Sequence, residues 1–165
     1  MAIHRIARSI SRGITKNIAK EITGRVSLIT NGGFENGTTG WVVQTDGIFA
    51  VETTIVHSGS QAAKLTIGTS GNNISQAINT VTGQSYSCSG WVYLDPTADL
   101  GYFYAASSAF GGVISTPANT TTKGSWVFLT WTFTAVGTTT YIGFGLTANS
   151  GDIAYGDDIE VYKAY

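Results

Sequence analysis

The chain has 165 residues, of which 42% are hydrophobic and only 12% are charged, and its formal net charge is −1. This length suits one globular domain with a sizeable core rather than several domains. The single cysteine, Cys88, excludes an internal disulfide and a zinc site built on cysteines. No segment of the sequence approaches the roughly 20 consecutive apolar residues that a transmembrane helix needs.

The charge is divided unevenly between two parts of the chain. Residues 1–25 hold six basic residues and one acid, a net charge of +5, whereas residues 26–165 hold three lysines and nine acids, a net charge of −6. A basic segment beside an acidic body is typical of an interaction tail on a globular domain. We therefore predict two parts, an arm over residues 1–25, called the basic arm below, and a domain over residues 26–165.

The basic arm has the pattern of an amphipathic α-helix. Its isoleucines and its bases both recur every three or four residues, and at 100° per residue the two sets fall on opposite faces. The apolar face is expected to hold Ile3, Ile6, Ile10, Ile14, Ile18 and Ile22, and the basic face is expected to hold Arg5, Arg8, Arg12, Lys16 and Lys20. Gly24 fits the end of such a helix.

Several roles for this helix differ in how well they fit the sequence. A secretion signal is disfavoured because bases interrupt every apolar run. A membrane-surface helix fits the charge but lacks Trp, Phe or Leu anchors, and nucleic-acid binding lacks aromatic residues between the bases. We favour docking on partner subunits of an assembly, or self-association into a homo-oligomer, because an isolated helix would leave its isoleucine face in water.

From Leu28 onward the hydrophobic period changes to two. Apolar residues alternate with polar or small ones at 126–134, 141–146 and 158–161, the pattern of half-buried β-strands. Further strands are expected over Phe49–Ile55, Ala62–Ile67, Ile74–Asn79, Ser85–Leu94 and Gly101–Ser107, and a loop over Thr116–Thr122. About nine or ten short strands separated by turn residues predict an all-β sandwich of two antiparallel sheets.

Four segments of the domain carry recognisable motifs. They are Asn31–Trp41 (NGGFENGTTGW), His57–Leu65 (HSGSQAAKL), 123–126 with 132–134 (KGSW and TFT), and Tyr155–Val161 (YGDDIEV). In this order they resemble the jelly-roll carbohydrate-binding modules related to families 4, 9 and 22, over about residues 28–163. The resemblance implies a two-sheet jelly roll. The same jelly roll also occurs in phage structural proteins, so the fold does not fix the function.

The resemblance also implies a structural calcium ion that ties the first strand to the last. Glu35 and Asp158 would be its carboxylate ligands, with Asp157 as a substitute, and backbone carbonyls around residues 57–60 would complete an oxygen shell. In the alternative, Glu35 and Asp158 cap turns or accept hydrogen bonds from backbone amides.

Aromatic side chains that stack on pyranose rings are the glycan contacts that the resemblance implies. Trp91 and Tyr93 share one face of their strand, and Tyr102 and Tyr104 share a face of the next. We expect these strands to be adjacent, which places the four rings within stacking reach of one another. The candidate polar partners are Asn73, Gln76 and Asn79. In the alternative, the rings belong to the core or to a subunit contact.

The sequence offers no catalytic constellation, so no enzymatic activity is expected. His4 lies in the basic arm, His57 lies in a turn, and Asp95 and Asp99 are solvated charges of a Pro-containing turn. We expect a non-catalytic structural or decoration protein on the surface of a phage virion, anchored by the basic arm and displaying the jelly roll. The alternative is an extracellular carbohydrate-binding module of an enzyme or cell-surface protein.

Deleting residues 1–25 should leave a soluble domain whose thermal midpoint hardly moves. The reason is that segments with different charge and different hydrophobic period do not share one core. Calorimetry of the truncated and the full-length chains measures this. If the truncated chain is unfolded, the two-part organisation is wrong.

Overall fold

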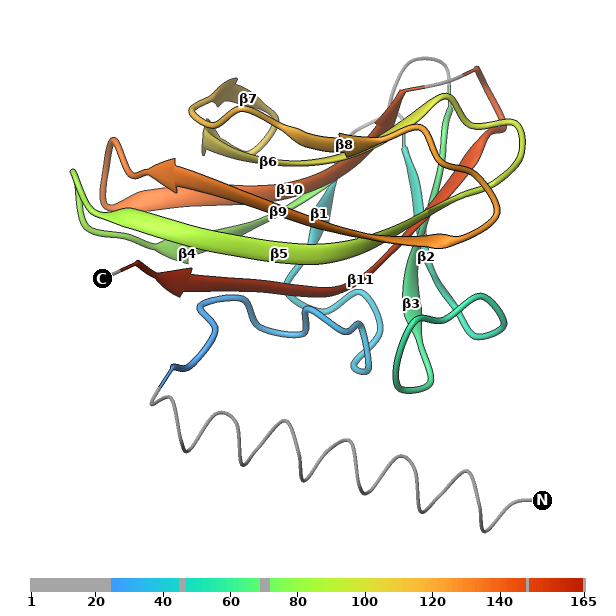
Figure 1. The fold of residues 1–165 in the computed structure, drawn as a ribbon, viewed down its shortest axis with the longest axis horizontal. Coiled ribbons are helices and arrows are strands. Elements are labelled where there is room, and N and C mark those ends of the chain that lie inside the picture. Colours follow the sequence, from blue (N-terminus) through green and yellow to red (C-terminus); the bar gives the residue numbers. More distant parts are fainter. Residues whose placement is uncertain (1–24, 45–46, 69–71, 148, 165) are drawn as a thin grey trace, which may run out of the picture.

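The computed structural model describes residues 25–44, 47–68, 72–147 and 149–164. Within these residues the chain forms two antiparallel β-sheets that pack face to face, and it contains no helix (Figure 1). The predicted all-β sandwich is confirmed, whereas the predicted helix of the basic arm lies outside the described residues. Among the described residues, no helix is long and apolar enough to cross a membrane.

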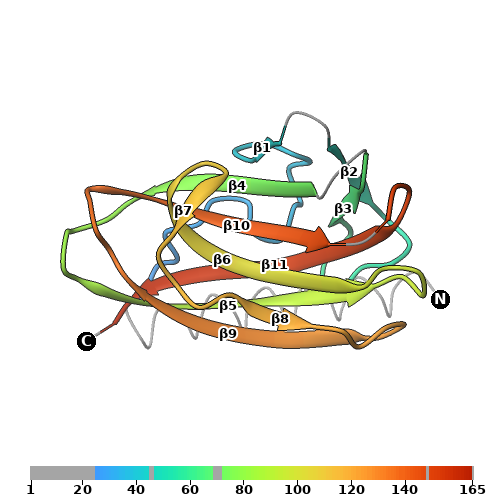
Figure 2. The same ribbon diagram turned by 90° about the horizontal axis from the view of Figure 1, so that it is seen from above.

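The two sheets contain strands from distant parts of the chain. The six-stranded sheet has the order β1-β4-β10-β6-β7, with β8 paired separately to β6, and the five-stranded sheet has the order β2-β3-β11-β5-β9. The first comprises β1 (Val42–Val43), β4 (Asn72–Asn79), β6 (Leu100–Ser108), β7 (Gly111–Val113), β8 (Ala118–Thr120) and β10 (Thr139–Thr147). The second comprises β2 (Ile48–Glu52), β3 (Ala62–Thr66), β5 (Ser85–Leu94), β9 (Trp126–Thr134) and β11 (Ile153–Lys163). Seen from above, β4, β10 and β6 lie to one side and β5 and β9 to the other (Figure 2).

The longer strands follow the period-two pattern closely. β5 has the predicted bounds. The inward residues of β10 are buried as the alternation indicates, and in β9 Trp131 and Phe133 are buried whereas Val127 and Leu129 are only partly buried. The expectation of an unbroken loop over Thr116–Thr122 is wrong, because β8 lies inside it. β1, β7 and β8 have only two or three residues each, which is too short to produce a periodic signal.

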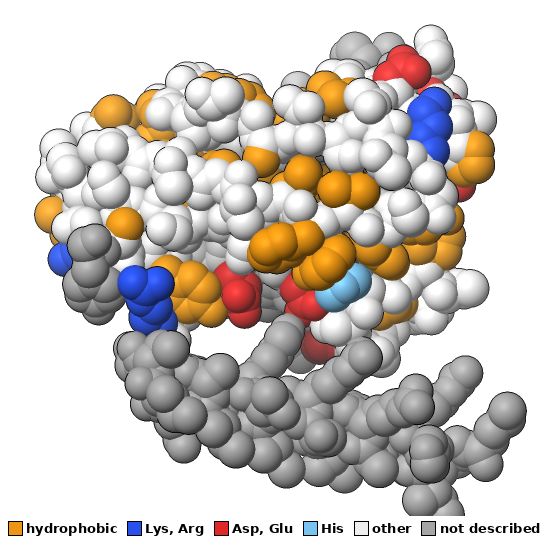
Figure 3. All heavy atoms as spheres, in the orientation of Figure 1, with side chains coloured by type: hydrophobic (Ala, Val, Ile, Leu, Met, Phe, Trp, Pro, Cys, Tyr) orange, Lys and Arg blue, Asp and Glu red, His pale blue; other side chains and the backbone are white. Residues whose placement is uncertain are grey.

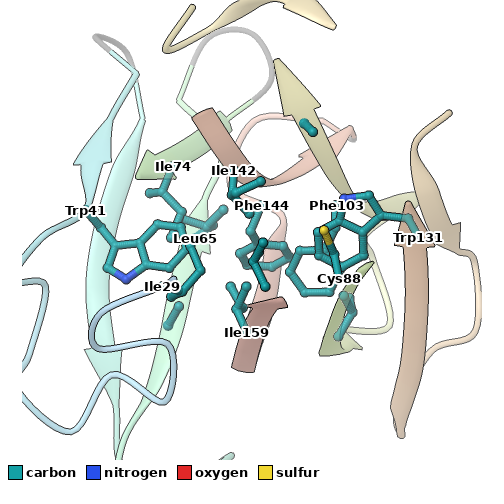
Figure 4. Packing of buried hydrophobic residues seen from close by; sticks show 14 of the residues in the cluster. Ile29, Trp41, Leu65, Ile74, Cys88, Phe103, Trp131, Ile142, Phe144 and Ile159 are labelled. Carbon is teal, nitrogen blue, oxygen red and sulfur yellow. The ribbon is translucent and has the colours of Figure 1, made fainter. Parts of the chain in front are cut away.

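Inward side chains of both sheets form one hydrophobic core. Figure 4 shows it as a continuous row that runs from Trp41 through Phe144 and Phe103 to Trp131. The ring of Phe103 stacks on that of Trp131 with centroids 5.0 Å apart, and it lies 5.3 Å from the ring of Phe144. Cys88 is buried in this core, as its alternation in β5 predicted.

The segment before β1 contributes Trp41 and one further ring, Phe34, to the core. The side-chain amide of Asn31 donates hydrogen bonds to the carbonyls of Gly37 and Thr39, at 2.9 and 3.0 Å, and so closes the segment into a loop. The loop buries Phe34 completely, with its ring 5.3 Å from that of Trp41. Asn31 and Phe34 both have positive φ, 54° and 56°, a costly conformation that only the surrounding contacts can maintain.

Replacing Gly90 with alanine should destabilise the domain by about 1–3 kcal/mol through overpacking. A Cβ atom at Gly90 would lie 2.7 Å from Cζ of Phe103, and that ring is held between two other core rings. Gly137→Ala is the matched control, because the nearest atom to its Cβ would be 3.9 Å away. Urea denaturation of both variants measures the difference; equal unfolding free energies would contradict the close packing at Gly90.

Candidate functional site

The four aromatic residues predicted to bind a glycan lie on two opposite faces of the sandwich. Trp91 and Tyr93 point outward from β5 in the five-stranded sheet, whereas Tyr102 and Tyr104 lie on the outer side of β6 in the six-stranded sheet. β5 and β6 are not sheet neighbours, so the expectation that the four rings lie side by side is wrong. The chain crosses between the sheets after β5, and alternation within a strand carries no information about such a crossing.

The outer face of the six-stranded sheet carries Gln44, Asn73, Tyr102 and Tyr104, called the tyrosine–amide surface below. The Tyr102 hydroxyl donates a hydrogen bond to Asn73 Oδ1 at 2.7 Å, and Asn73 Nδ2 donates one to Gln44 Oε1 at 2.9 Å. These three residues are half-buried, so each retains some contact with solvent. The ring centroids of Tyr102 and Tyr104 are 6.0 Å apart. The surface therefore presents a ring beside two oriented amides.

Two glycines of β10 make room for these rings. Gly145 pairs with Tyr102 and with Asn73, and Gly143 pairs with Tyr104; a Cβ atom at either glycine would collide with the tyrosine beside it. Tyr104 lies so close to the sheet that only 4% of it is exposed. Burial raises the pKa of both hydroxyls, although the bond to Asn73 opposes this at Tyr102. Both hydroxyls therefore remain protonated donors at neutral pH.

Of the predicted polar partners among the described residues, Asn73 alone is hydrogen-bonded to one of the tyrosines, Tyr102. Gln76 is 5% exposed and instead holds the segment before β1. Its side chain accepts a hydrogen bond from Thr30 N and donates one to Thr30 O, each at 2.8 Å. Asn79 is exposed at the end of β4. The sequence analysis missed Gln44, which follows the two-residue β1 and has no periodic neighbours to mark it.

The outer face of the five-stranded sheet carries His57, Trp91, Tyr93, Trp126 and Phe128, called the aromatic surface below. His57 stacks on Trp91 with centroids 3.9 Å apart at an interplanar angle of 19°, and it meets Trp126 edge-on at 5.6 Å. Trp91 lies 5.0 Å from Phe128, and Tyr93 lies 5.8 Å from Trp126. Figure 3 shows hydrophobic side chains gathered beside the histidine on this face. The alternation of β9 was the signal that could have added Trp126 and Phe128 to the candidates.

A buried carboxylate of β11 holds the segment that carries His57. Asp157 is fully buried. Its Oδ2 accepts hydrogen bonds from His57 N (3.1 Å) and Ser58 N (3.0 Å), and its Oδ1 accepts one from Asp158 N (2.7 Å). Burial raises the pKa of this carboxyl to about 7; the amide hydrogen bonds oppose the shift, and the charge of Asp158 adds to it. A β-bulge follows Asp157, where Asp158 has a φ of 50° and brings Oδ2 to 2.9 Å from His57 Nδ1.

Glu35 holds the loop between β2 and β3. Its Oε1 accepts hydrogen bonds from Ser60 N (2.9 Å) and Gln61 N (3.0 Å), and its Oε2 accepts one from Ser60 Oγ (2.7 Å). Gly59 has a φ of 71°, and a Cβ atom there would collide with the Glu35 carboxylate. The glycine of the Ser58-Gly59 motif is therefore needed both for its backbone conformation and for this close approach.

Among the described residues, one group of three side chains converges closely enough to hold a metal ion. Ligand atoms of His57, Asp157 and Asp158 all lie within 4.8 Å of one another, and Glu35 is not part of this group. Gly33 of the first loop lies beside both aspartates. Aspartate oxygens suit calcium, which prefers an all-oxygen shell, whereas an imidazole nitrogen does not. Of the predicted ligands, Asp157 and Asp158 belong to this group, whereas Glu35 lies outside it.

Comparisons with solved structures find the same fold in carbohydrate-binding modules and in a phage protein. TmCBM61 in complex with β-1,4-galactotriose has a TM-score of 0.65 at 19% identity over 84% of this chain and 99% of its own. The CBM22-1 xylan-binding domain from Paenibacillus barcinonensis Xyn10C has a TM-score of 0.64 at 16% identity over 84% and 95%. The enzymatically active domain of tailspike protein 4 from bacteriophage CBA120 has a TM-score of 0.63 at 14% identity over 84% of this chain but only 22% of its own.

The sequence itself matches one protein family over most of its length. No curated protein matches the chain. Residues 26–150, however, match the family CBM_4_9, described as carbohydrate binding domain. That span contains the first three of the four motifs and all but the last of the strands. The chain therefore belongs to the carbohydrate binding domain family.

Proposed function

We propose that the chain is a carbohydrate-binding module and that the tyrosine–amide surface binds the glycan. The observation that carries this proposal is the hydrogen-bonded row from Tyr102 through Asn73 to Gln44 in a member of a carbohydrate-binding family. An aromatic ring suits the C–H face of a pyranose, and fixed amides suit its hydroxyls. Because these side chains already orient one another, binding would cost little conformational entropy. The proposal assigns no reaction to the chain.

A role on a phage particle is the second proposal, and its support is narrower. It rests on the fold shared with the tailspike domain, of which this chain spans 22%, and on the predicted docking of the basic arm. The family match favours a module of an enzyme or of a cell surface. We therefore propose an extracellular or cell-surface location first and the virion surface second; glycan binding would serve either one.

We also propose that calcium stabilises the contact between β11 and the loop before β1 that contains Gly33. Asp157 and Asp158 would hold the ion, with carbonyl oxygens of the adjoining loops as further ligands. A divalent cation would offset the cost of burying the Asp157 charge, the main cause of its raised pKa. Glu35 is left out because it is not part of the group in which the ligand atoms of His57, Asp157 and Asp158 converge.

Tyr102→Ala should weaken glycan binding by about tenfold or more, since it removes a ring and an oriented hydroxyl, and tenfold corresponds to about 1.4 kcal/mol. The panel is soluble β-1,4-galactan, xylan and cello-oligosaccharides, because TmCBM61 was solved with β-1,4-galactotriose and the CBM22-1 relative is a xylan-binding domain. Calorimetric titration of the wild type should give a dissociation constant of about a millimolar, as shallow sites do.

Gln44→Ala is the second variant, because its side chain lies at the end of the row and its removal leaves the Tyr102 ring in position. Thr82→Ala, at an exposed position between β4 and β5 that belongs to neither proposed surface, is the matched control. Circular dichroism establishes that each variant is folded. If the wild type binds nothing in the panel, or if folded Tyr102→Ala and Gln44→Ala both bind as tightly as the wild type, the tyrosine–amide surface is not the site.

In the presence of a chelator, the domain should lose stability as the pH rises from about 4 to about 7. Unfolded aspartate has a pKa of about 3.9, whereas folded Asp157 has a pKa of about 7. Between these values the folded state holds the extra proton, so stability falls as the proton is released. Calcium competes with that proton and should therefore raise the melting temperature more at about pH 7.5 than at about pH 5. An unchanged melting temperature in calcium at the higher pH would remove the ion from the proposal.

A further inference from the structure

The aromatic surface is the largest group of partly exposed rings that the tyrosine–amide surface does not include. Trp91 pairs in register with Phe128, and Tyr93 pairs with Trp126, within nine consecutive β5–β9 pairs that show no register shift. Such a regular two-strand ribbon holds its outward rings side by side. Phe128 is 52% exposed, an unusual exposure for a phenylalanine unless a ligand or partner covers it.

We propose that the aromatic surface is a second carbohydrate-binding surface, which takes the flat C–H face of an equatorially linked, uncharged polysaccharide. It lies on the opposite side of the sandwich from the tyrosine–amide surface and shares no residue with it. The inference is therefore independent of the proposed function. A chain with both surfaces would contact two polysaccharide chains at once.

The composition of this face favours a polysaccharide over a protein partner. β5 and β9 contain no charged residue, although Glu160 of the neighbouring strand β11 pairs with Ser89 at the edge of this ribbon. Beyond the rings, the outward positions of the two strands are hydroxyl residues only, paired as Ser89 with Thr130, Ser87 with Thr132 and Ser85 with Thr134. None of these outward positions is aliphatic. Rings followed by a ladder of hydroxyls offer apolar faces to the C–H face of a sugar and hydrogen-bonding groups to its hydroxyls.

His57 and Trp91 are also held in place before any ligand arrives. His57 is held through its backbone by Asp157 and through its imidazole by Asp158, at 3.1 and 2.9 Å, and it stacks on Trp91. No hydrogen bond within the described part of the chain uses the indole N–H of Trp126 or the hydroxyl of Tyr93. A rigid apolar surface with polar groups at its rim loses little entropy on binding and still orients its ligand.

The test uses the full chain and two insoluble polysaccharides, microcrystalline cellulose and chitin. We expect the wild type to be depleted from solution by at least one of them and the double variant Phe128→Ala/Trp126→Ala to partition about tenfold less. Trp91 is left intact because His57 stacks on it. Tyr102→Ala is the control, and it should bind the insoluble polysaccharide as the wild type does. Circular dichroism and the melting temperature establish that the variants are folded.

Three outcomes would overturn the proposal. The first is a wild type that neither polysaccharide retains, and the second is a folded double variant that binds as well as the wild type. The third is a dimer in light scattering that the double variant converts to a monomer, because a second copy would then be the occupant. Loss of soluble-glycan binding in Tyr102→Ala, with the binding to cellulose or chitin unchanged, would support both surfaces separately.

Discussion

The aromatic surface depends on the carboxylate of Asp157, which ties the loop after β2 to the central strand β11. A buried carboxylate is tolerated only when hydrogen bonds replace the water that it has lost. Here two of the three amide donors come from the loop after β2, and the third comes from the next residue of β11. One side chain therefore fixes that loop against the centre of the five-stranded sheet.

This constraint reaches the surface through His57. Because its backbone N–H is bound to Asp157, its imidazole is held above Trp91, and the bulge brings Asp158 to its other side. The Glu35 carboxylate fixes the remainder of the same loop by accepting from the amides of Ser60 and Gln61. Acidic side chains that a family resemblance assigns to a metal thus have a structural role in this fold whether or not a cation is bound.

The sequence predicted the strands well and their assignment to sheets poorly. Alternation identified β5 to the residue and the inward side of β9 and of β10, because burial on one face imposes a period of two. Alternation shows which side chains leave the core, but not which of two sheets a strand joins. Trp91 and Tyr102 were consequently grouped together although they lie on opposite faces.

The contacts of the candidate sites were harder to predict than their residue types. Trp91, Tyr102 and Asn73 could be selected as binding residues by their chemistry alone. The partners that define each surface, Gln44 and His57, come from segments without periodicity. Their positions depend on long-range hydrogen bonds, from Asn73 to Gln44 and from His57 to Asp157. The first of these bonds joins residues that are 29 positions apart in the sequence, and the second joins residues that are 100 positions apart. Both separations are beyond the reach of any local pattern.

The position of β11 has a consequence for synthesis of the protein. It lies between β3 and β5 in the middle of its sheet, yet it follows every other described strand along the chain. While the chain emerges from the ribosome, β2 with β3 and β5 with β9 can form only two separate ribbons, each with an unpaired inner edge. Pairing over such sequence distances is slow, and open edges invite association with other chains. Aggregation during translation should therefore be most severe in the interval before Ile153–Lys163 has left the ribosome and joined the two ribbons.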